Sequence, residues 1–424
     1  MTLSPAAPDA ASALWTCPFC PLLCDGFALE QSGTGYALAG SDCPRAAAAL
    51  ARFPAVPAPA FGAPLIDGSP VTLDAALDAA AGVLAASRQP LIGGLGTDVD
   101  GARALYALAC ATGAISDAAA GEALLHGLRA LQDRGAYTTT LAEVRNRADV
   151  IVCFGSSPRE AQPEIWRRLG IGEPLVAQRH LEFVGAPVDA ALGGATGVTQ
   201  ASVPLAGDLF STAGLLAALV SGQRVQAPAE LVALAERLRA ATYAVIVWEA
   251  ARLPAHGTLV VEALNRIVAR LNLHTRAATL PLGGGDGAAT VNQVFSWLSG
   301  LPLRSRAGPL GLEHEPVRFD AQALLAAGSV DALVWVASFG TERAPPAHGV
   351  PSIVLGGPGV APPAKGIHIP VGTPGIDAPG HLFRTDGMVT LPLHAVRHSG
   401  LPSVAEVVRA LTERVLRTKR AVQP

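Results

Sequence analysis

Four of the six cysteines lie close to the N-terminus, in a spacing that suits metal chemistry. They are Cys17, Cys20, Cys24 and Cys43, in the pattern C-x2-C-x3-C-x18-C. Three thiolates on one tight turn and a fourth from a returning segment can bind a tetrahedral metal ion or a cubane iron–sulfur cluster, because both need four soft ligands. The x3 gap argues mildly against structural zinc, whose ligands more often come as two C-x2-C pairs. The alternative is a set of ordinary buried or disulfide cysteines, which does not explain the spacing.

The elements around this loop are short. Residues 27–30 and 36–38 predict two strands of a hairpin that returns the chain to Cys43. Residues 46–53 predict a helix, and prolines at 54, 57, 59 and 64 predict a linker. Residues 1–60 are therefore expected to form a cysteine-rich N-terminal lobe and linker. The two remaining cysteines, Cys110 in a predicted helix and Cys153 in a predicted strand, are expected to be isolated core residues.

From residue 72 onward, helical patterns alternate with continuous apolar runs, which is typical of parallel sheets covered on both faces. The expected fold class is α/β, with two doubly wound, mostly parallel-sheet lobes. We expect residues 61–160 to form the first lobe, completed by residues 325–424, and residues 161–324 to form the second. The predicted strands are residues 90–96, 148–155, 243–248, 332–336, 352–355 and 367–371, and the predicted helices include residues 98–111 and 258–271.

Composition limits the function classes. The chain has 424 residues, of which 50% are hydrophobic, and a formal charge of −3 with no basic run, so nothing favours nucleic acid as a partner. The small basic stretch from Arg414 to Arg420 is expected to be a solvated helix end. No apolar run is long enough to span a bilayer, and the N-terminus does not follow the pattern of a secretion signal. We therefore expect a cytoplasmic protein with reduced thiols or metal ligands.

Glycines follow several predicted strands, where open α/β sheets bind ligands. Gly93-Gly-Leu-Gly96 lacks the third glycine of the dinucleotide fingerprint, and a tight turn explains it without a ligand. Gly283-Gly-Gly-Asp-Gly287 predicts either a loop folded against a ligand or partner, or a flexible surface loop. The scattered histidines form no H-E-x-x-H motif, and no serine lies in G-x-S-x-G. The sequence thus predicts no catalytic residue.

The order of segments resembles the molybdopterin oxidoreductase superfamily, and within it the B subunit of formylmethanofuran dehydrogenase. The resemblance covers nearly the whole chain, and its most specific part lies around residues 130–150. The segments that carry it are Cys24-Asp25, residues 130–133 (Ala-Leu-Gln-Asp), residues 140–150 with Glu-Val-Arg-Asn-Arg-Ala-Asp, residues 292–302 with Asn-Gln-Val, and residues 383–387 (Phe-Arg-Thr-Asp-Gly). The resemblance implies that the cysteine loop binds an iron–sulfur cluster.

One departure from the family pattern affects the expected activity. Redox-active members carry a cysteine or selenocysteine ligand to molybdenum or tungsten before the segment at residues 130–133. Residues 115–129 of this chain contain no cysteine, and Glu122 and His126 would be weak substitutes because the metal prefers sulfur. The chain is thereby most similar to the B subunit of the formyltransferase/hydrolase complex of methylotrophic bacteria. That similarity implies a non-redox scaffold for one-carbon metabolism, whose partners are an amidohydrolase-like subunit, a formyltransferase subunit and a C subunit.

Two alternatives remain open from the sequence alone. The chain could be an active metallopterin-dependent formylmethanofuran or formate dehydrogenase subunit, or a free-standing iron–sulfur or zinc protein. The four cysteines could bind a [4Fe-4S] cluster, zinc or nothing, and molybdopterin is expected to be absent. Weakly charged segments at residues 307–311, 345–348 and 358–363 are expected to need neighbouring subunits.

Overall fold

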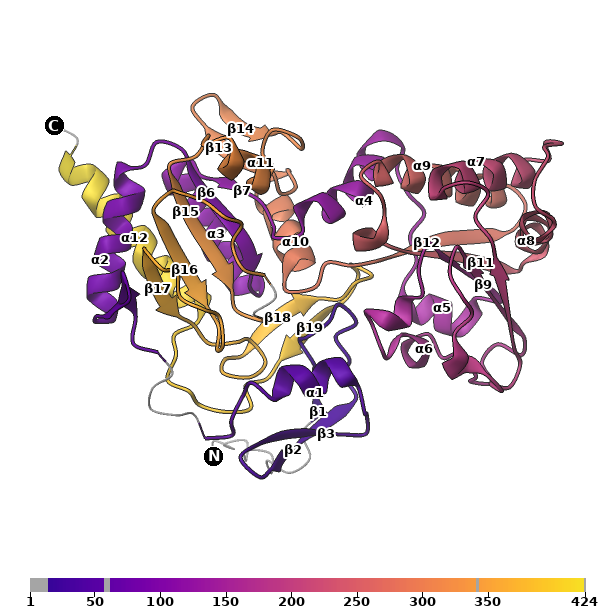
Figure 1. The fold of residues 1–424 in the computed structure, drawn as a ribbon, viewed down its shortest axis with the longest axis horizontal. Helices are drawn as coiled ribbons and strands as arrows, with labels where there is room; N and C mark the ends of the chain where they lie inside the picture. Colours follow the sequence, from indigo (N-terminus) through magenta and orange to yellow (C-terminus); the bar gives the residue numbers. More distant parts are fainter. Residues whose placement is uncertain (1–13, 57–61, 341–342, 423–424) are drawn as a thin grey trace, which may run out of the picture. The chain divides into compact units, whose positions relative to one another are not determined.

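The computed structural model describes residues 14–56, 62–340 and 343–422. This chain divides into two compact units, each with its own sheet (Figure 1). Unit 1 contains the described residues of 1–121, 285–383 and 390–424, and unit 2 contains residues 122–284 and 384–389. Both units combine helices with parallel strands, so the predicted α/β class is confirmed.

Unit 1 is built on a nine-stranded sheet with a parallel centre and antiparallel edges. Five parallel strands form the centre, and each edge carries two short antiparallel strands. In spatial order the strands are β14 (Gly311–His314), β13 (Ser305–Gly308), β7 (Ile115–Ser116), β6 (Pro90–Gly96), β15 (Ala332–Ala337), β16 (Ser352–Gly356), β17 (Ile367–Pro370), β4 (Leu65–Ile66) and β5 (Ser69–Pro70). β6, β15 and β16 are buried along their whole length, as their continuous apolar sequences predict.

The helix that follows β6 in unit 1 has capping residues at both ends. The Asp98 carboxylate accepts a hydrogen bond from the Gly101 backbone N–H at 3.1 Å and so caps the helix that follows β6. Gly113, with φ of 73°, ends the same helix in a left-handed conformation. The helices are α1 (Pro44–Leu50), α2 (Leu73–Ala86), α3 (Val99–Thr112), α10 (Ala288–Ser299), α11 (Ala321–Ala326) and α12 (Val404–Val422).

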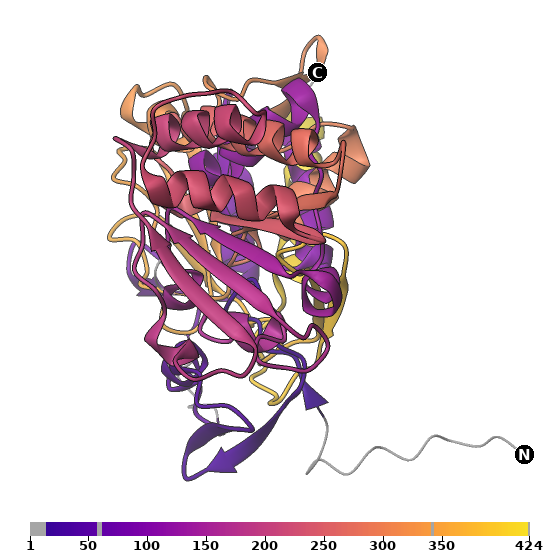
Figure 2. The same ribbon diagram turned by 90° about the vertical axis from the view of Figure 1, so that its right-hand side faces the viewer.

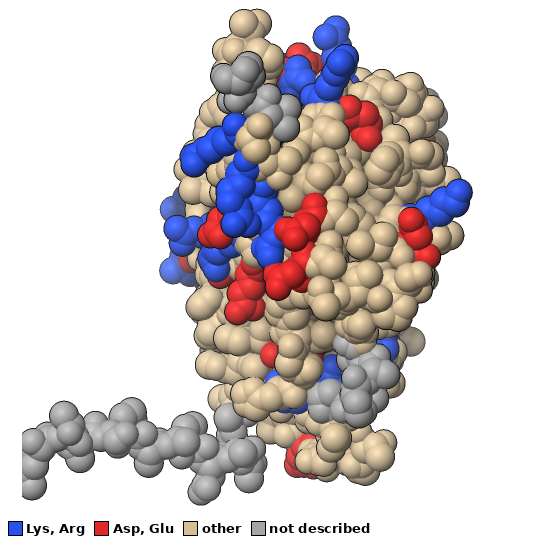
Figure 3. Space-filling model, turned by 90° about the vertical axis from the view of Figure 1, so that its left-hand side faces the viewer, with Lys and Arg blue, Asp and Glu red and all other residues tan. Residues whose placement is uncertain are grey.

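The C-terminal helix α12 packs along α2 and α3. Arg414 of α12 contacts two carboxylates of α2, Asp74 at 2.5 Å and Asp78 at 2.9 Å, and Lys419 donates to the Ala111 carbonyl at 3.0 Å. Figure 3 shows basic and acidic side chains gathered on this side of the protein, beside large areas that lack both. The basic stretch is therefore not simply a solvated helix end, because two of its residues join α12 to neighbouring helices.

Two smaller sheets complete unit 1. The first contains β1 (Leu14–Trp15), β2 (Phe27–Ser32) and β3 (Gly35–Ala39), and its β2–β3 hairpin is the one predicted from the sequence. The second is a hairpin of β18 (Gly380–Phe383) and β19 (Thr390–Leu393). Residues 307–311, expected to need a neighbouring subunit, span the turn of the β13–β14 hairpin, where Leu310 is 97% exposed, and that expectation stays a prediction.

Unit 2 contains a five-stranded, fully parallel sheet. α7 and α9 lie side by side against this sheet (Figure 2), and α7 also contacts α8. The strand order is β10 (Val198–Val203), β9 (Arg179–Val184), β8 (Val150–Phe154), β11 (Tyr243–Glu249) and β12 (Arg276–Leu282). The helices are α4 (Gly121–Arg134), α5 (Leu141–Arg147), α6 (Ile165–Arg168), α7 (Leu209–Val220), α8 (Ala229–Ala240) and α9 (Gly257–Leu271), with short 3₁₀ turns at Pro158–Glu160, Ala190–Leu192 and Ala250–Arg252.

The division of the chain differs from the expected lobes at both internal boundaries. The sequence places β8 in the first lobe, but β8 lies at the centre of the second sheet, paired with β9 and β11. It places β13 and β14 in the second lobe, but they extend the sheet of unit 1. The apolar pattern identifies these strands, whereas their partners depend on pairing between distant segments.

Within the described residues, no helix is both long enough and apolar enough to cross a membrane.

Candidate functional site

The four cysteines of the N-terminal pattern all lie in unit 1 and are buried. The Cys17 N–H donates to the Cys24 carbonyl at 2.9 Å, and the Leu23 N–H donates to the Cys20 carbonyl at 3.2 Å. These bonds close the loop into a tight turn, in which Leu23 adopts a positive φ of 43°. Cys43 lies at the N-cap position of α1.

Neighbouring segments hold the cysteine loop in place. The Trp15 indole donates to the Gly375 carbonyl at 2.8 Å, and Arg45 Nε donates to the Phe19 carbonyl at 2.6 Å. Leu23 packs in a buried cluster with Phe339 and the β18–β19 hairpin. The loop is thus part of the core of unit 1.

The thiols of Cys17 and Cys20 favour their protonated form in this environment. Burial raises the pKa of Cys17 well above its usual value, and the nearby Cys20, Cys24 and Cys43 raise it further. Burial also raises the pKa of Cys20, although Arg45 opposes the shift. A bound metal ion would have to displace these protons, because the thiolate is the ligand.

The cysteines fit a metal or cluster in donor type and burial but not in their detailed arrangement. Four buried soft donors lie in this part of unit 1, and the charges of Cys20, Cys24 and Cys43 raise the pKa of Cys17. Over residues 14–56, 62–340 and 343–422, however, no three His, Cys, Asp or Glu side chains are grouped as metal ligands. Binding would therefore require side-chain rearrangement together with deprotonation, and metal binding by Cys17, Cys20, Cys24 and Cys43 stays a prediction.

The other two cysteines differ from each other. Cys153 in β8 is 1% exposed, which confirms the expected core position. Cys110 is exposed, so its expected core position was wrong. The inward face of α3 is formed by residues such as Leu105, Leu108 and Ala109, and Cys110 follows on the outer side.

The glycines at the end of β6 make room for a neighbouring strand. A Cβ at Gly93 would lie 2.7 Å from the Trp335 ring, and one at Gly94 would lie 2.6 Å from the Val336 carbonyl oxygen. Gly94 also has a positive φ of 74°. Packing against β15 therefore explains these glycines without a ligand.

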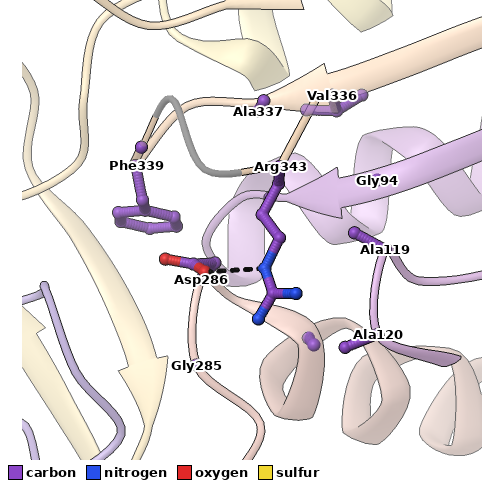
Figure 4. A pocket seen from close by; sticks show the side chains of 12 residues that line it. Gly94, Ala119, Ala120, Gly285, Asp286, Val336, Ala337, Phe339 and Arg343 are labelled. Atoms are coloured by element: carbon purple, nitrogen blue, oxygen red, sulfur yellow. Dashed lines mark hydrogen bonds and ion pairs between the residues drawn. The ribbon is translucent and has the colours of Figure 1, made fainter. Parts of the chain in front are cut away.

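A small cavity lies at the carboxyl ends of β6 and β15 (Figure 4). Its walls include Ala119, Ala120 and Phe339, and Arg343 forms an ion pair with Asp286 at its edge, with Nε and Oδ2 3.3 Å apart. The cavity volume is about 20 Å³, which is room for about one water molecule. In this conformation, the usual ligand position of an open α/β sheet holds only this small cavity in unit 1.

The glycine-rich loop before α10 packs against its own chain. A Cβ at Gly287 would lie 2.2 Å from the Thr97 carbonyl oxygen, and Gly287 has a positive φ of 78°. A Cβ at Gly285 would lie 3.4 Å from Pro21 of the cysteine loop. Close approach to the Thr97 backbone explains why glycine is needed at position 287, whereas the contact of Gly285 with Pro21 is an ordinary van der Waals contact.

The interval that lacks a cysteine contains a buried carboxylate that the sequence did not reveal. Asp117, two residues after Ile115 begins β7, forms an ion pair with Arg304 and accepts from the Ala321 N–H at 2.9 Å. Burial raises the pKa of Asp117 to about 6 against the opposing effect of Arg304. No pattern marked this pair, since the two residues are far apart in the sequence.

Glu122 and His126, the substitutes for the missing thiolate, occupy different environments in unit 2. Glu122 is exposed at the start of α4, whereas His126 is 4% exposed and lies close to Gly257.

Two segments that carry the family resemblance meet in unit 2. The Asp386 carboxylate accepts from the Leu141 N–H at 3.2 Å and from Arg384 at 2.6 Å. Asp149 accepts from the N–H groups of Thr242 and Tyr243, both at 2.8 Å, and so ties β8 to β11. These acidic residues of the two segments therefore hold the fold together.

Comparison with known proteins gives the family. No profile of a protein family matches the chain. The chain is 32% identical over 358 residues to the B subunit of the formyltransferase/hydrolase complex Fhc of Methylorubrum extorquens, covering 82% of this chain and 96% of the relative. The chain belongs to the Fhc B-subunit family. The resemblance seen in the sequence is thus confirmed.

More distant similarity and a solved structure agree with this membership. The B subunit of the tungsten-containing formylmethanofuran dehydrogenase 2 of Methanocaldococcus jannaschii is 25% identical over 410 residues, covering 88% of this chain and 91% of the relative. A chain in the crystal structure of FhcABCD from Methylorubrum extorquens in complex with methylofuran matches with a TM-score of 0.75 and 32% identity. That match covers 84% of this chain and 99% of the solved one.

Proposed function

We propose that this chain is the non-redox scaffold (B) component of a formyltransferase/hydrolase complex in one-carbon metabolism. The observation that carries the proposal is its 32% identity to the Fhc B subunit over nearly the whole relative. The absence of a cysteine from residues 115–129 supports the non-redox part, because molybdenum and tungsten prefer sulfur ligands.

In this proposal the chemistry belongs to partner subunits. An amidohydrolase-like subunit releases formate, and a formyltransferase subunit moves the formyl group between tetrahydromethanopterin and a methanofuran-type carrier. This chain and the C subunit hold the two in register. The solved FhcABCD complex supports such an assembly.

We also propose that Cys17, Cys20, Cys24 and Cys43 form the metal-binding loop of this subunit. A [4Fe-4S] cluster is the first candidate ligand, with zinc or four reduced thiols as the alternatives. Molybdopterin is proposed to be absent, because residues 115–129 contain no cysteine to bind its metal.

The finer architecture and the location of the protein belong to the same proposal. Each unit is doubly wound, residues 14–56 act as a small cysteine-rich lobe within unit 1, and the complex is cytoplasmic. The parallel centres of both sheets and the separate three-stranded sheet support the architectural part. The lobes expected from the sequence, residues 1–60, 61–160 with 325–424, and 161–324, are replaced by units 1 and 2.

A second candidate function is a metallopterin-dependent dehydrogenase subunit, favoured by the 25% identity to tungsten-containing formylmethanofuran dehydrogenase. A free-standing iron–sulfur or zinc protein is the third and rests only on the cysteine loop. The scaffold and the dehydrogenase differ in a measurable way. A dehydrogenase contains molybdenum or tungsten and reduces a viologen dye with the formyl carrier, whereas the proposed complex hydrolyses the formyl group without an electron acceptor.

The test is expression of the chain alone and with the hydrolase, transferase and C subunits, followed by size-exclusion chromatography. We expect the chain alone to aggregate or be degraded, and co-expression to give a stable, stoichiometric complex with hydrolytic activity. A stable monomer that does not join the co-expressed subunits would refute the scaffold function and favour the free-standing metalloprotein. Dye reduction together with molybdenum or tungsten would favour the dehydrogenase.

A further inference from the structure

Unit 2 contains a broad groove at the amino ends of β11 and β12. The groove has a volume of about 680 Å³, and all its lining residues belong to unit 2. The groove lies beside α5, a helix that belongs to the segment with the most specific family resemblance. The side chains that matter below are Tyr137, Glu143, Asn146, Arg147, Leu175 and Arg276.

The acidic groups of the groove are already engaged within the protein. Both carboxylate oxygens of Asp149 accept backbone N–H groups, from Thr242 and Tyr243. Glu143 lies 3.5 Å from Arg147, one helical turn away on α5. Neither carboxylate is available to bind a cationic ligand without giving up these contacts.

The available polar groups are mainly hydrogen-bond donors. Arg276 is exposed and makes no ion pair within the described part of the chain. Asn146 is exposed as well. Arg147 forms an exposed ion pair with Glu143, and such pairs contribute little to the free energy of folding. Arg147 and Arg276 both line the groove. This arrangement favours an anion, and in particular a carboxylate.

Apolar surface lies next to these donors. Tyr137 is 55% exposed and Leu175 is 54% exposed, and both line the groove. The Tyr137 backbone is fixed against β12, because its carbonyl accepts from the Thr279 N–H at 2.7 Å. An anchored tyrosine beside arginines is typical of contacts that dominate protein interfaces.

We infer that this groove binds an extended segment of a partner subunit, with an acidic side chain between Arg147 and Arg276 and an apolar side chain against Tyr137 and Leu175. The inference deepens the scaffold function and rests on it. A volume of about 680 Å³ far exceeds the space that a single carboxylate needs, and the exposed apolar surface would contribute nothing to binding a small anion.

The first test identifies the occupant in the intact complex. A photoreactive benzoyl-phenylalanine at position 137 is irradiated in the co-expressed complex, and mass spectrometry identifies the captured peptide. We expect a cross-link to an acidic segment of another subunit. An intact complex with no cross-link to another subunit would overturn the inference.

The second test measures the charge requirement. Arg276→Glu should weaken binding of this subunit to its partners about tenfold and increase the salt sensitivity of the complex. Arg239→Glu is the matched control, since Arg239 is also an exposed arginine of unit 2 without an ion pair among the described residues. Replacing the captured acidic residue by arginine should restore binding of the Arg276→Glu variant.

The outcomes separate the groove from the scaffold function. If the unmodified complex assembles and both charge variants bind equally well, the groove inference fails and the scaffold function stands. If Arg276→Glu changes activity without changing assembly, and no cross-link forms, the occupant is a small anion and the inference is wrong. If the unmodified subunits never assemble, the scaffold function fails and the inference fails with it.

Discussion

Arg304 and Asp117 form an ion pair inside unit 1, with Nε and Oδ2 3.2 Å apart and both side chains 2% exposed. Arg304 also contacts Asp320 at 2.5 Å, and Asp117 accepts from the Ala321 backbone. The network thereby connects the start of the interval that lacks a cysteine to α11. Replacing one residue of the pair would leave the charge of the other buried without a partner, which strongly destabilises a protein.

The first prediction concerns the pH dependence of stability. Burial raises the pKa of Asp117 to about 6, above the value of about 4 in an unfolded chain. The stabilising contribution of protonated Asp117 is therefore complete below pH 4 and is lost as the pH rises through 6, by at most about 3 kcal/mol. Asp117→Asn should remove this dependence, and Arg304→Met should move it above pH 6. Urea unfolding from pH 4 to 7 measures it, and parallel curves for Asp117→Asn and the unmodified protein would contradict the assignment.

The second prediction concerns the glycine-rich loop. Gly287→Ala should destabilise the protein by about 2–4 kcal/mol, because the new Cβ meets the Thr97 backbone in a left-handed conformation. Gly328→Ala is the matched control, with φ of 60° and open space around the added atom, and should cost only about 1 kcal/mol. Thermal unfolding compares them. Equal losses would mean that strain alone, without the close approach, explains Gly287.

The third prediction concerns the cysteine loop. If the loop binds an iron–sulfur cluster, the purified complex should absorb broadly in the visible range, and Cys20→Ala should abolish that absorption. Colourless protein with one zinc ion per chain would indicate a structural metal instead. Cys153→Ser is unsuitable as a control because Cys153 is buried, so Cys110→Ser serves this purpose. Metal loss in Cys110→Ser equal to that in Cys20→Ala would refute the assignment of the loop.

The fourth prediction concerns thiol reactivity. Cys110 is the one exposed cysteine among the described residues, whereas the other five are buried. Brief treatment with a maleimide under native conditions should label Cys110 first, and peptide mass spectrometry identifies the site. Cys110→Ser should remove the rapid label. Rapid labelling of Cys17 or Cys20 would show that the loop opens readily.

Much of the secondary structure could be predicted, since the apolar runs of β6, β11 and β15 and the helical pattern of α9 are long and regular. The partners of these strands could not be predicted in the same way. The sequence of β8 predicts a buried strand in either unit, and only its pairing with β9 and β11 places it in unit 2.

The candidate site was partly predictable for similar reasons. The spacing of Cys17, Cys20 and Cys24 required a tight turn, and the structure contains that turn. The roles of Gly93 and Gly287 could not be distinguished by sequence, because glycine allows close approach equally to a ligand and to the chain's own backbone. The buried position of Arg304 could not be predicted from neighbouring residues, because its partner Asp117 is distant in sequence.

The insertion of unit 2 between β7 and α10 has a consequence for the order of folding during synthesis. All five strands of unit 2 have left the ribosome soon after Leu282 is made, so its sheet can form early. The central sheet of unit 1 forms later, because β6 pairs with β15, and β15 is synthesised after all five strands of the unit 2 sheet. Until β15 is made, the edge of β6 that it will cover stays unpaired and apolar, which favours aggregation of the nascent chain.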